Sequence, residues 1–211
     1  MQKGLQALDT FKSACIAFVN GINNTLDEHL LSSLQISRYA GFKDIHCLYR
    51  ASSGAALDVA ESACALLYHR SSVISEEIKR SMADYFAEHP QGMYLQICHS
   101  NGAIQVYNAL KDLQSNREMI KRVVVVAIAP AKIIPSAMCG RAVNYVSVSH
   151  GIPRDIVPFF DVVGLIKNRQ DVRFVQAHPK ADLWDHSFLS PTYGAVMEQE
   201  IQNFIESMTI K

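Results

Sequence analysis

Residues 93–110 read MYLQICHSNGAIQVYNAL, and this stretch decides the fold. Its first six residues form an apolar run typical of a buried strand, and the residues after the serine continue at helical spacing. Ser100 therefore sits at a tight strand-to-helix corner, where the neighbouring residues must be small because strand and helix nearly touch. Gly102 meets this requirement, whereas Cys98 stands where the Gly-x-Ser-x-Gly pattern has its first glycine. Because cysteine carries a Cβ, we expect some strain at the turn or a slight shift of the helix.

The rest of the chain alternates short apolar runs with longer helical patterns. The runs predict strands at 14–20, 45–49, 93–98, 122–129, 144–149 and 172–177. The helical patterns lie at 26–39, 55–68, 75–89, 101–113 and 193–207. Near-continuous apolar strands that alternate with helices indicate a parallel sheet covered by helices on both faces. We therefore predict a single α/β domain over residues 1–211, a doubly wound three-layer α/β/α sandwich with a mainly parallel sheet of about six strands.

Composition excludes several classes of protein. The 211 residues are 49% hydrophobic and 19% charged, and 20 Lys plus Arg balance 20 Asp plus Glu. With positive and negative charges in balance, the sequence shows no excess of Lys and Arg of the kind that binds nucleic acid. We find no secretory signal and no apolar run of the length an integral membrane helix needs, so we expect a cytoplasmic protein, with signal-less export left open. The five cysteines lack the spacing of a zinc site or a redox pair and are expected to be reduced and structural.

A second polar segment, FVNGINN at residues 18–24, follows the first predicted strand. Gly21 allows a sharp backbone turn, after which the N–H of Ile22 or Asn23 can point back toward the Ser100 corner. Acyl transfer needs two N–H donors where the oxyanion forms, and the N–H of Asn101 is the natural second donor. The alternative interpretation of this segment is an ordinary Asn-Gly turn followed by a helix cap.

A third pair of segments offers an acid and a base. Asp155 follows the fifth predicted strand, and His186 lies on the long loop after the sixth. A serine hydroxyl needs a neighbouring imidazole to accept its proton, and the imidazole needs a carboxylate to fix its tautomer. The order Ser100, Asp155, His186, with each residue after its own strand, is much more specific than any one of the three residues alone.

Rival residues remain for both roles. Asp161 is an alternative acid, although it is expected to lie inside the following helix, and His178 is an alternative base that lies nearer to its strand. His99 is expected to point away from Ser100 into the packing between strands and helix.

The loop around His186 contains further polar and aromatic residues. Asp182 and Asp185 are expected to shape this loop rather than to transfer protons. Trp184 either borders an acyl pocket or anchors the loop, and anchoring is the favoured interpretation.

These residues resemble the α/β-hydrolase superfamily, most closely its lipase and esterase branches, over about residues 14–208. The resemblance rests on the Asn20-Gly21 loop, the nucleophile elbow at Ser100, the loop at 151–158 and the histidine loop. It implies that Ser100 is the nucleophile, Asp155 the acid and His186 the base of a catalytic triad. It also implies an oxyanion hole formed by Asn101 and by Ile22 or Asn23.

The chain departs from that family in two respects. Cys98 replaces the first glycine of the elbow, and the amino-terminal pair of strands found in larger members is missing. We therefore expect a minimal form whose six strands are all parallel. Residues 131–143 are too few for a large helical lid or cap domain, so a shallow, open site is predicted.

The predicted function is a serine hydrolase of the carboxylic-ester type, an esterase, lipase or thioesterase that works through an acyl-enzyme intermediate. The expected partner is a small acyl ester or lipid-like substrate, with no cofactor, no metal and no nucleic acid, and no oligomeric state follows from the pattern. The alternative is a non-catalytic α/β-hydrolase-fold protein that binds a partner or small ligand, for which Cys98 is the motivation. A dinucleotide-binding module is excluded because no G-x-G-x-x-G loop follows any predicted strand.

Overall fold

The computed structural model describes residues 14–22, 24–41, 43–49 and 72–209. The helix predicted at 55–68 and the candidate oxyanion residue Asn23 lie outside the described residues.

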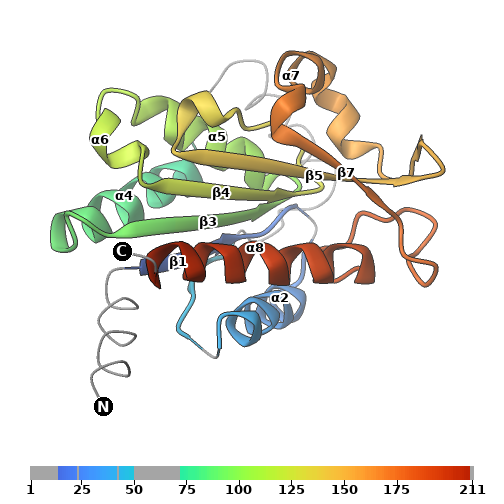
Figure 1. The fold of residues 1–211 in the computed structure, drawn as a ribbon, viewed down its shortest axis with the longest axis horizontal. Helices are drawn as coiled ribbons and strands as arrows, with labels where there is room; N and C mark the ends of the chain where they lie inside the picture. Colours follow the sequence, from blue (N-terminus) through green and yellow to red (C-terminus); the bar gives the residue numbers. More distant parts are fainter. Residues whose placement is uncertain (1–13, 23, 42, 50–71, 210–211) are drawn as a thin grey trace.

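The centre of the molecule is one twisted sheet (Figure 1). Within the described residues its strands are β1 (Ala14–Val19), β2 (His46–Leu48), β3 (Met93–His99), β4 (Val123–Ile128), β5 (Arg141–Ser149), β6 (Ile152–Pro153) and β7 (Val172–Gln176). They run in the order β2-β1-β3-β4-β5-β6, and β7 pairs with β5. The strand that leads to Ser100 is therefore central, with β1 on one side and β4 on the other.

Most strand pairs are parallel, as predicted, but the prediction of an all-parallel sheet is wrong. The two-residue strand β6 turns back on the end of β5 and pairs with it antiparallel, Val148 opposite Pro153 and Ser149 opposite Ile152. A strand this short has no hydrophobic pattern of its own, so period-based analysis of the sequence does not find it.

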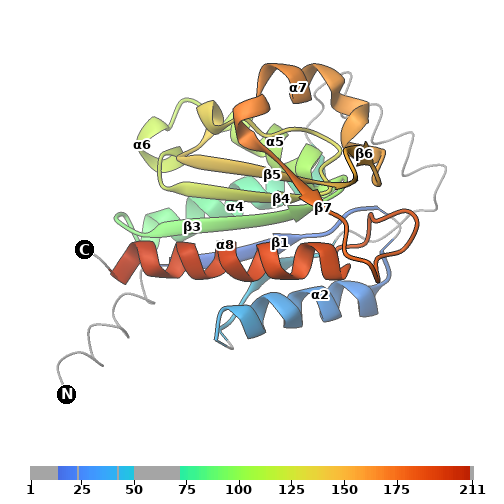
Figure 2. The ribbon, with the colours of Figure 1, turned by 45° about the vertical axis from the view of Figure 1, so that its right-hand side comes forward.

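Helices cover both faces of the sheet (Figures 1 and 2). Their bounds are α2 (Leu26–Tyr39), α4 (Val73–Glu88), α5 (Gly102–Asp112), α6 (Arg117–Ile120), α7 (Val162–Lys167) and α8 (Pro191–Thr209), with short 3-10 turns η1 (Ser136–Met138), η2 (Val157–Asp161) and η3 (Arg169–Asp171). Helices α2 and α8 lie together on one face, whereas α4 and α5 lie on the other. The predicted three-layer α/β/α architecture is confirmed.

Each face of the sheet has its own hydrophobic core. On one side Ala17 and Val125 pack with Met82 of α4 and Val106 of α5. On the other side Phe18, Leu95 and Val126 belong to a cluster that includes residues from α2 and α8. Every residue of β4 is buried, which explains its unbroken VVVVAI sequence, because a strand covered on both faces has no solvent side to make polar.

Strand β5 begins three residues earlier than predicted. Residues 141–143 pair with 124–126 of β4, although the first of them is the charged Arg141. The Arg141 guanidinium lies 2.7 Å from the buried carboxylate of Glu200 on α8. This ion pair neutralises the charge of Arg141, which can therefore form part of the strand. A prediction based on apolar runs does not extend a strand to a charged residue such as Arg141, so it placed the start of β5 too late.

Local sequence also fixes where helices begin. Thr25 and Glu28 form a capping box at the start of α2, each side chain bonding the backbone N–H of the other. Helix α6 was not predicted because four residues are too few to show a helical period. The helix expected around Asp161 is the short segment formed by η2 and α7. Residues 131–143 contain the turn η1 and the first three residues of β5, so this segment carries no helical lid.

The described cysteines, Cys15, Cys47, Cys98 and Cys139, all carry free thiols. In the part of the chain that the structure describes, no helix is both long and apolar enough to span a bilayer.

Candidate active site

Ser100 occupies the corner between β3 and α5 in a strained backbone conformation. Its φ of 53° lies in the left-handed region that non-glycine residues rarely adopt. Hydrogen bonds hold this corner in place: the Ser100 N–H donates to Ile128 O (3.1 Å), and the Ser100 carbonyl accepts from the N–H groups of Ala103 (3.1 Å) and Ala131 (3.0 Å). Such strain persists only where surrounding structure imposes it, and it is typical of a serine presented at a nucleophile elbow.

Two glycines make the corner sterically possible. A Cβ on Gly102 would lie 2.8 Å from the carbonyl oxygens of both Val19 and Asn20, so only glycine allows α5 to start this close to the end of β1. A Cβ on Gly21 would lie 2.6 Å from Ser100 Cβ. The loop after β1 therefore runs against Ser100. From the sequence, this loop was expected to turn toward the Ser100 corner at Gly21.

Cys98 does not prevent the tight turn. Its backbone is regular strand, paired with Val19 and Ala127 on the two neighbouring strands, and its side chain is fully buried. Burial raises the pKa of the Cys98 thiol, so the group stays protonated and behaves as a small apolar side chain. The turn is reached through the positive φ of Ser100, with the first glycine of the usual pattern absent.

The structure brings Ser100, His186 and Asp155 into one hydrogen-bonded chain. Ser100 Oγ lies 2.9 Å from His186 Nε2, and His186 Nδ1 lies 2.8 Å from Asp155 Oδ2. Because the ionised carboxylate only accepts, Nδ1–H is the donor to it, which leaves the Nε2 lone pair for the serine hydroxyl. Asp155 is 1% exposed and Ser100 5%, whereas the His186 side chain is 30% exposed.

The rival residues lie elsewhere. Asp161 lies in the helical segment after Asp155, as expected: it is the last residue of η2 and caps α7. Its carboxylate accepts from the N–H groups of Gly164 and Ile133 and pairs with Lys132 at 3.1 Å. His178 Nδ1 accepts from the N–H of Lys180 in its own loop. Neither rival is joined to Ser100 by a hydrogen bond that the structure describes.

His99 does not point away from the site, so that prediction is wrong. Its Nε2 lies 2.7 Å from the carbonyl oxygen of His186, and the two rings lie 4.9 Å apart. The carbonyl can only accept, so His99 Nε2–H donates to it. Burial, with a smaller effect of nearby His186, lowers the pKa of His99 to about 3, and the ring is therefore neutral at physiological pH.

This contact could not be read from the strand pattern, because His99 directly precedes Ser100 and neighbouring residues of a strand point to opposite faces. Positive φ at Ser100 breaks that alternation.

The His186 loop is anchored from both sides of the histidine. The Asp185 carboxylate is 1% exposed and accepts hydrogen bonds from Ser147 (2.5 Å), Thr192 (2.6 Å) and Ser190. Phe188, also buried, packs on Phe18 with ring centroids 4.7 Å apart. Asp185 thus shapes the loop as expected. Its hydroxyl partners were not predicted, although Ser147, between two valines of the predicted strand, could have indicated a buried polar contact.

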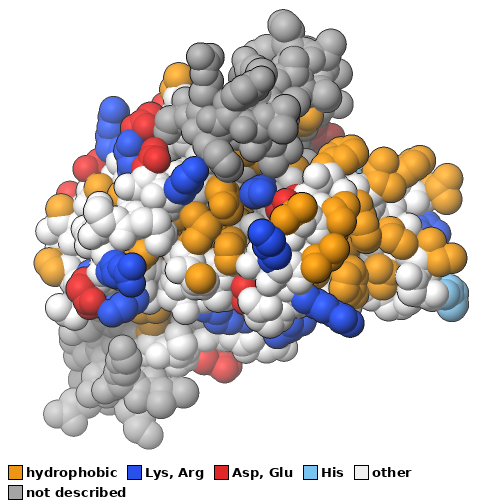
Figure 3. Space-filling view, turned by 90° about the horizontal axis from the view of Figure 1, so that it is seen from above, with side chains coloured by type: hydrophobic (Ala, Val, Ile, Leu, Met, Phe, Trp, Pro, Cys, Tyr) orange, Lys and Arg blue, Asp and Glu red, His pale blue; other side chains and the backbone are white. Residues whose placement is uncertain are grey.

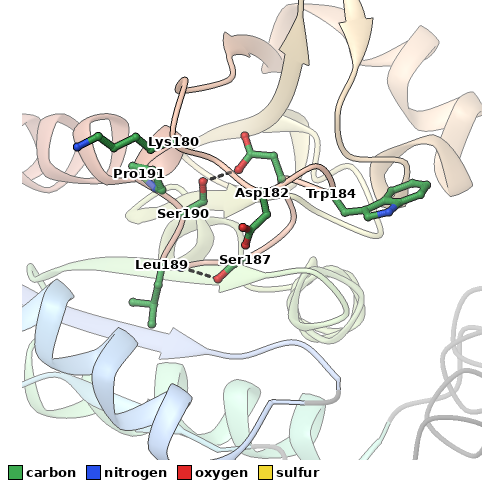
Figure 4. Close-up of a pocket in the computed structure, with 8 residues that line it drawn as sticks. Lys180, Asp182, Trp184, Ser187, Leu189, Ser190 and Pro191 are labelled. Atoms are coloured by element: carbon green, nitrogen blue, oxygen red, sulfur yellow. Dashed lines mark hydrogen bonds between the residues drawn. The ribbon is translucent and has the colours of Figure 1, made fainter.

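Trp184 does not anchor the loop through its side chain, which is 62% exposed. A small cavity in this loop is lined by Trp184 and its neighbours, and Figure 4 shows the indole directed away from the other labelled side chains. The cavity lining includes Asp185 and Ser187 but not His186 between them. It therefore belongs to the support of the loop, and its lining includes none of Ser100, Asp155 and His186.

The predicted oxyanion residues flank Ser100. Asn101 follows it directly at the amino end of α5, where the helix dipole favours negative charge. Ile22 follows Gly21, whose Cα already contacts the Ser100 side chain.

Comparisons with known proteins place the chain in a family and a fold. Residues 8–170 match the family described as "Protein of unknown function (DUF687)". No curated protein matches the chain. Among solved structures, a protein assigned as a YdeN-like hydrolase from Pectobacterium atrosepticum is 13% identical over 99% of both chains, with a TM-score of 0.50.

Two further solved structures are similar. A cutinase-like protein from Cryptococcus sp. is 15% identical, covering 93% of this chain and 95% of its own, with a TM-score of 0.47. The catalytic core of acetyl xylan esterase from Trichoderma reesei is 13% identical over 93% of this chain and 99% of its own, with a TM-score of 0.46. At these identities the likeness is one of fold, and the expected α/β-hydrolase fold is confirmed.

Proposed function

We propose that this chain, which belongs to the DUF687 family, is a serine hydrolase that cleaves carboxylic esters or thioesters through an acyl-enzyme intermediate. The observation that carries the proposal is the hydrogen-bonded series Ser100 Oγ–His186 Nε2 and His186 Nδ1–Asp155 Oδ2, at 2.9 and 2.8 Å. This is the arrangement that activates a serine hydroxyl as a nucleophile. The solved hydrolases of similar fold agree with it.

In the first half of the reaction Ser100 Oγ forms a bond to the ester carbonyl carbon while its proton passes to His186 Nε2. The carbonyl π electrons move to the oxygen, and the proposed donors for that oxyanion are the N–H groups of Asn101 and Ile22. Asp155 stabilises the imidazolium through Nδ1–H. When the carbon–oxygen bond to the alcohol breaks, the alcohol takes its proton from His186 Nε2.

The second half repeats these steps with water. His186 Nε2 accepts a proton from water, the water oxygen bonds to the acyl carbon, and the bond from that carbon to Ser100 Oγ breaks. The proton on Nε2 returns to Ser100 Oγ, and a carboxylic acid leaves. The 30% exposed edge of His186 gives water access to this step.

Two measurements test the proposal. A fluorophosphonate probe should label the purified protein at Ser100, and the label should be absent in Ser100→Ala. A chain-length series of chromogenic esters should be hydrolysed about 10⁴-fold or more faster by wild type than by Ser100→Ala. A folded wild-type protein that neither reacts with the probe nor hydrolyses any ester in the series would instead be a non-catalytic binding protein, and the proposal would be wrong.

A further inference from the structure

One surface of the molecule carries exposed apolar side chains on a short continuous segment. We call it the docking face, and it consists of Ile152, Ile156, Phe160, Val162, Val163 and Ile166, on β6, the loop after it, η2 and α7. Ile166 is 73% exposed and Phe160 69%, values far above those of a core side chain. In Figure 3 hydrophobic side chains gather on the right of the view, and Figure 2 labels α7 and β6 close together on one side of the sheet.

The docking face has an uneven distribution of charge. Between residues 150 and 181 all three acidic side chains, Asp155, Asp161 and Asp171, are buried and hydrogen-bonded inside the protein. Lys167 and Arg169, by contrast, are exposed at the end of α7. Figure 3 shows Lys and Arg side chains bordering the hydrophobic area. Exposed apolar side chains beside positive charge are the combination that binds an anionic lipid surface.

We propose that the docking face binds reversibly to a lipid surface with anionic headgroups. Ile152, Phe160 and Ile166 would enter the boundary between headgroups and acyl chains, and Lys167 and Arg169 would pair with headgroup phosphates. A second copy of the chain is a poorer occupant, because each docking face exposes Lys167 and Arg169 while Asp155, Asp161 and Asp171 are buried, so two such faces would bring like charges together.

The docking face adjoins the site through one loop. Asp155, whose carboxylate bonds His186, lies between Ile152 and Ile156, so the same loop turns its acid inward and its isoleucines outward. Contact with lipid at this loop would bring the Ser100 site to esters dissolved in that surface. This last step, a lipid-soluble ester as substrate, rests on the proposed function, whereas the docking itself does not.

Vesicle sedimentation tests the docking. Wild type and Ser100→Ala should both sediment with vesicles of equal parts phosphatidylcholine and phosphatidylglycerol, and only weakly with phosphatidylcholine alone. The double variant Phe160→Ser/Ile166→Ser should bind the anionic vesicles on the order of tenfold or more weakly. Lys167→Gln/Arg169→Gln should bind them roughly 25-fold more weakly, because each basic residue near such a surface contributes about fivefold.

The matched control is Leu30→Ser/Leu34→Ser, which removes two exposed leucines of α2 on the other side of the sheet. It should bind like wild type, and circular dichroism should show every variant folded. The proposal is overturned if folded wild type does not bind anionic vesicles, or if the control loses binding equally. It is also overturned if the Phe160/Ile166 variant changes the oligomeric mass instead of vesicle binding.

Hydrolysis of a water-soluble short-chain ester separates this proposal from the proposed function. The docking variants should hydrolyse that ester at the wild-type rate, because their side chains do not touch the triad. Absence of hydrolysis in a protein that still binds vesicles would count against the proposed function alone. Hydrolysis of the soluble ester without vesicle binding would count against the docking alone.

Discussion

The Cα of Gly21 lies directly against the side chain of Ser100. A Cβ built on Gly21 would come within 2.6 Å of Ser100 Cβ and 3.1 Å of Ser100 Oγ, and 3.3 Å of His99 Nδ1. The contact follows from the sheet, because β1 and β3 are parallel neighbours that end at the same edge. The loop proposed to supply one oxyanion donor thus packs closely against the side chain of the proposed nucleophile.

Gly21→Ala should therefore damage the site more than the fold. The new methyl group must displace Ser100 or the loop, and we expect ester hydrolysis to fall by about 10²-fold, because small misplacements of reacting groups cost this much. The free energy of unfolding should fall by about 1–3 kcal/mol, as for other overpacked positions. Steady-state kinetics and denaturant unfolding measure the two effects.

Gly194→Ala is the matched control for this substitution. Its Cβ would meet only the flexible ends of Tyr39, at 3.2 Å, and Gln35, at 3.8 Å. It should leave hydrolysis unchanged. Full activity in Gly21→Ala would show that the loop after β1 takes no part in the reaction.

The two candidate acids give the second prediction. Asp155→Asn should reduce kcat for ester hydrolysis by about 10⁴-fold, because an amide in place of the carboxylate no longer fixes the His186 tautomer. Asp161→Asn should leave kcat nearly unchanged and instead lower the free energy of unfolding by about 1–3 kcal/mol. Its carboxylate accepts from two backbone N–H groups and pairs with Lys132 inside the protein. If the two variants showed the opposite pattern of effects, Asp161 would be the functional acid.

Much of the fold was predictable because its signals are local. Strand β4 is apolar throughout, and α2 begins at a capping box, so both could be read from adjacent residues. The short β6 could not, because two residues show no period of their own. The early start of β5 at Arg141 could not, because it depends on pairing with β4 and on the ion pair with Glu200.

The site divides in the same way. Ser100, Asp155 and His186 could be proposed from their order after successive strands, and the structure joins them by hydrogen bonds. The contact from His99 could not be predicted, because it depends on the positive φ of the next residue. The partners of Asp185 come from β5 and the start of α8, so they become neighbours only after folding.

Asp185 gives a third prediction. Asp185→Asn replaces a carboxylate that accepts from three hydroxyl groups with an amide that accepts at only one atom. We expect a loss of about 1–3 kcal/mol in the free energy of unfolding and a lower kcat, because His186 is the next residue. Asp182→Asn, at an exposed position of the same loop, should change neither quantity. Equal stability of the two variants would contradict the anchoring role of Asp185.

Buried His99 makes the stability of the protein depend on pH. Burial lowers the pKa of His99 to about 3 in the folded state. Among the described residues, His99 Nδ1 has no hydrogen-bond partner, so no acceptor would stabilise a proton on this nitrogen. The unfolded chain protonates this imidazole near pH 6.5, the ordinary value. Below pH 6.5 the unfolded state therefore binds a proton that the folded state does not, and stability falls as the pH falls toward 3.

Between pH 6.5 and pH 5 this residue should account for a loss of about 2 kcal/mol in the free energy of unfolding. His99→Gln removes the titration, so its stability should decline less than that of wild type over the same range, by about that amount. His178→Gln, which removes an exposed imidazole, should follow the wild-type profile. Urea unfolding at a series of pH values measures all three, and parallel profiles for wild type and His99→Gln would show that His99 is not held neutral by burial.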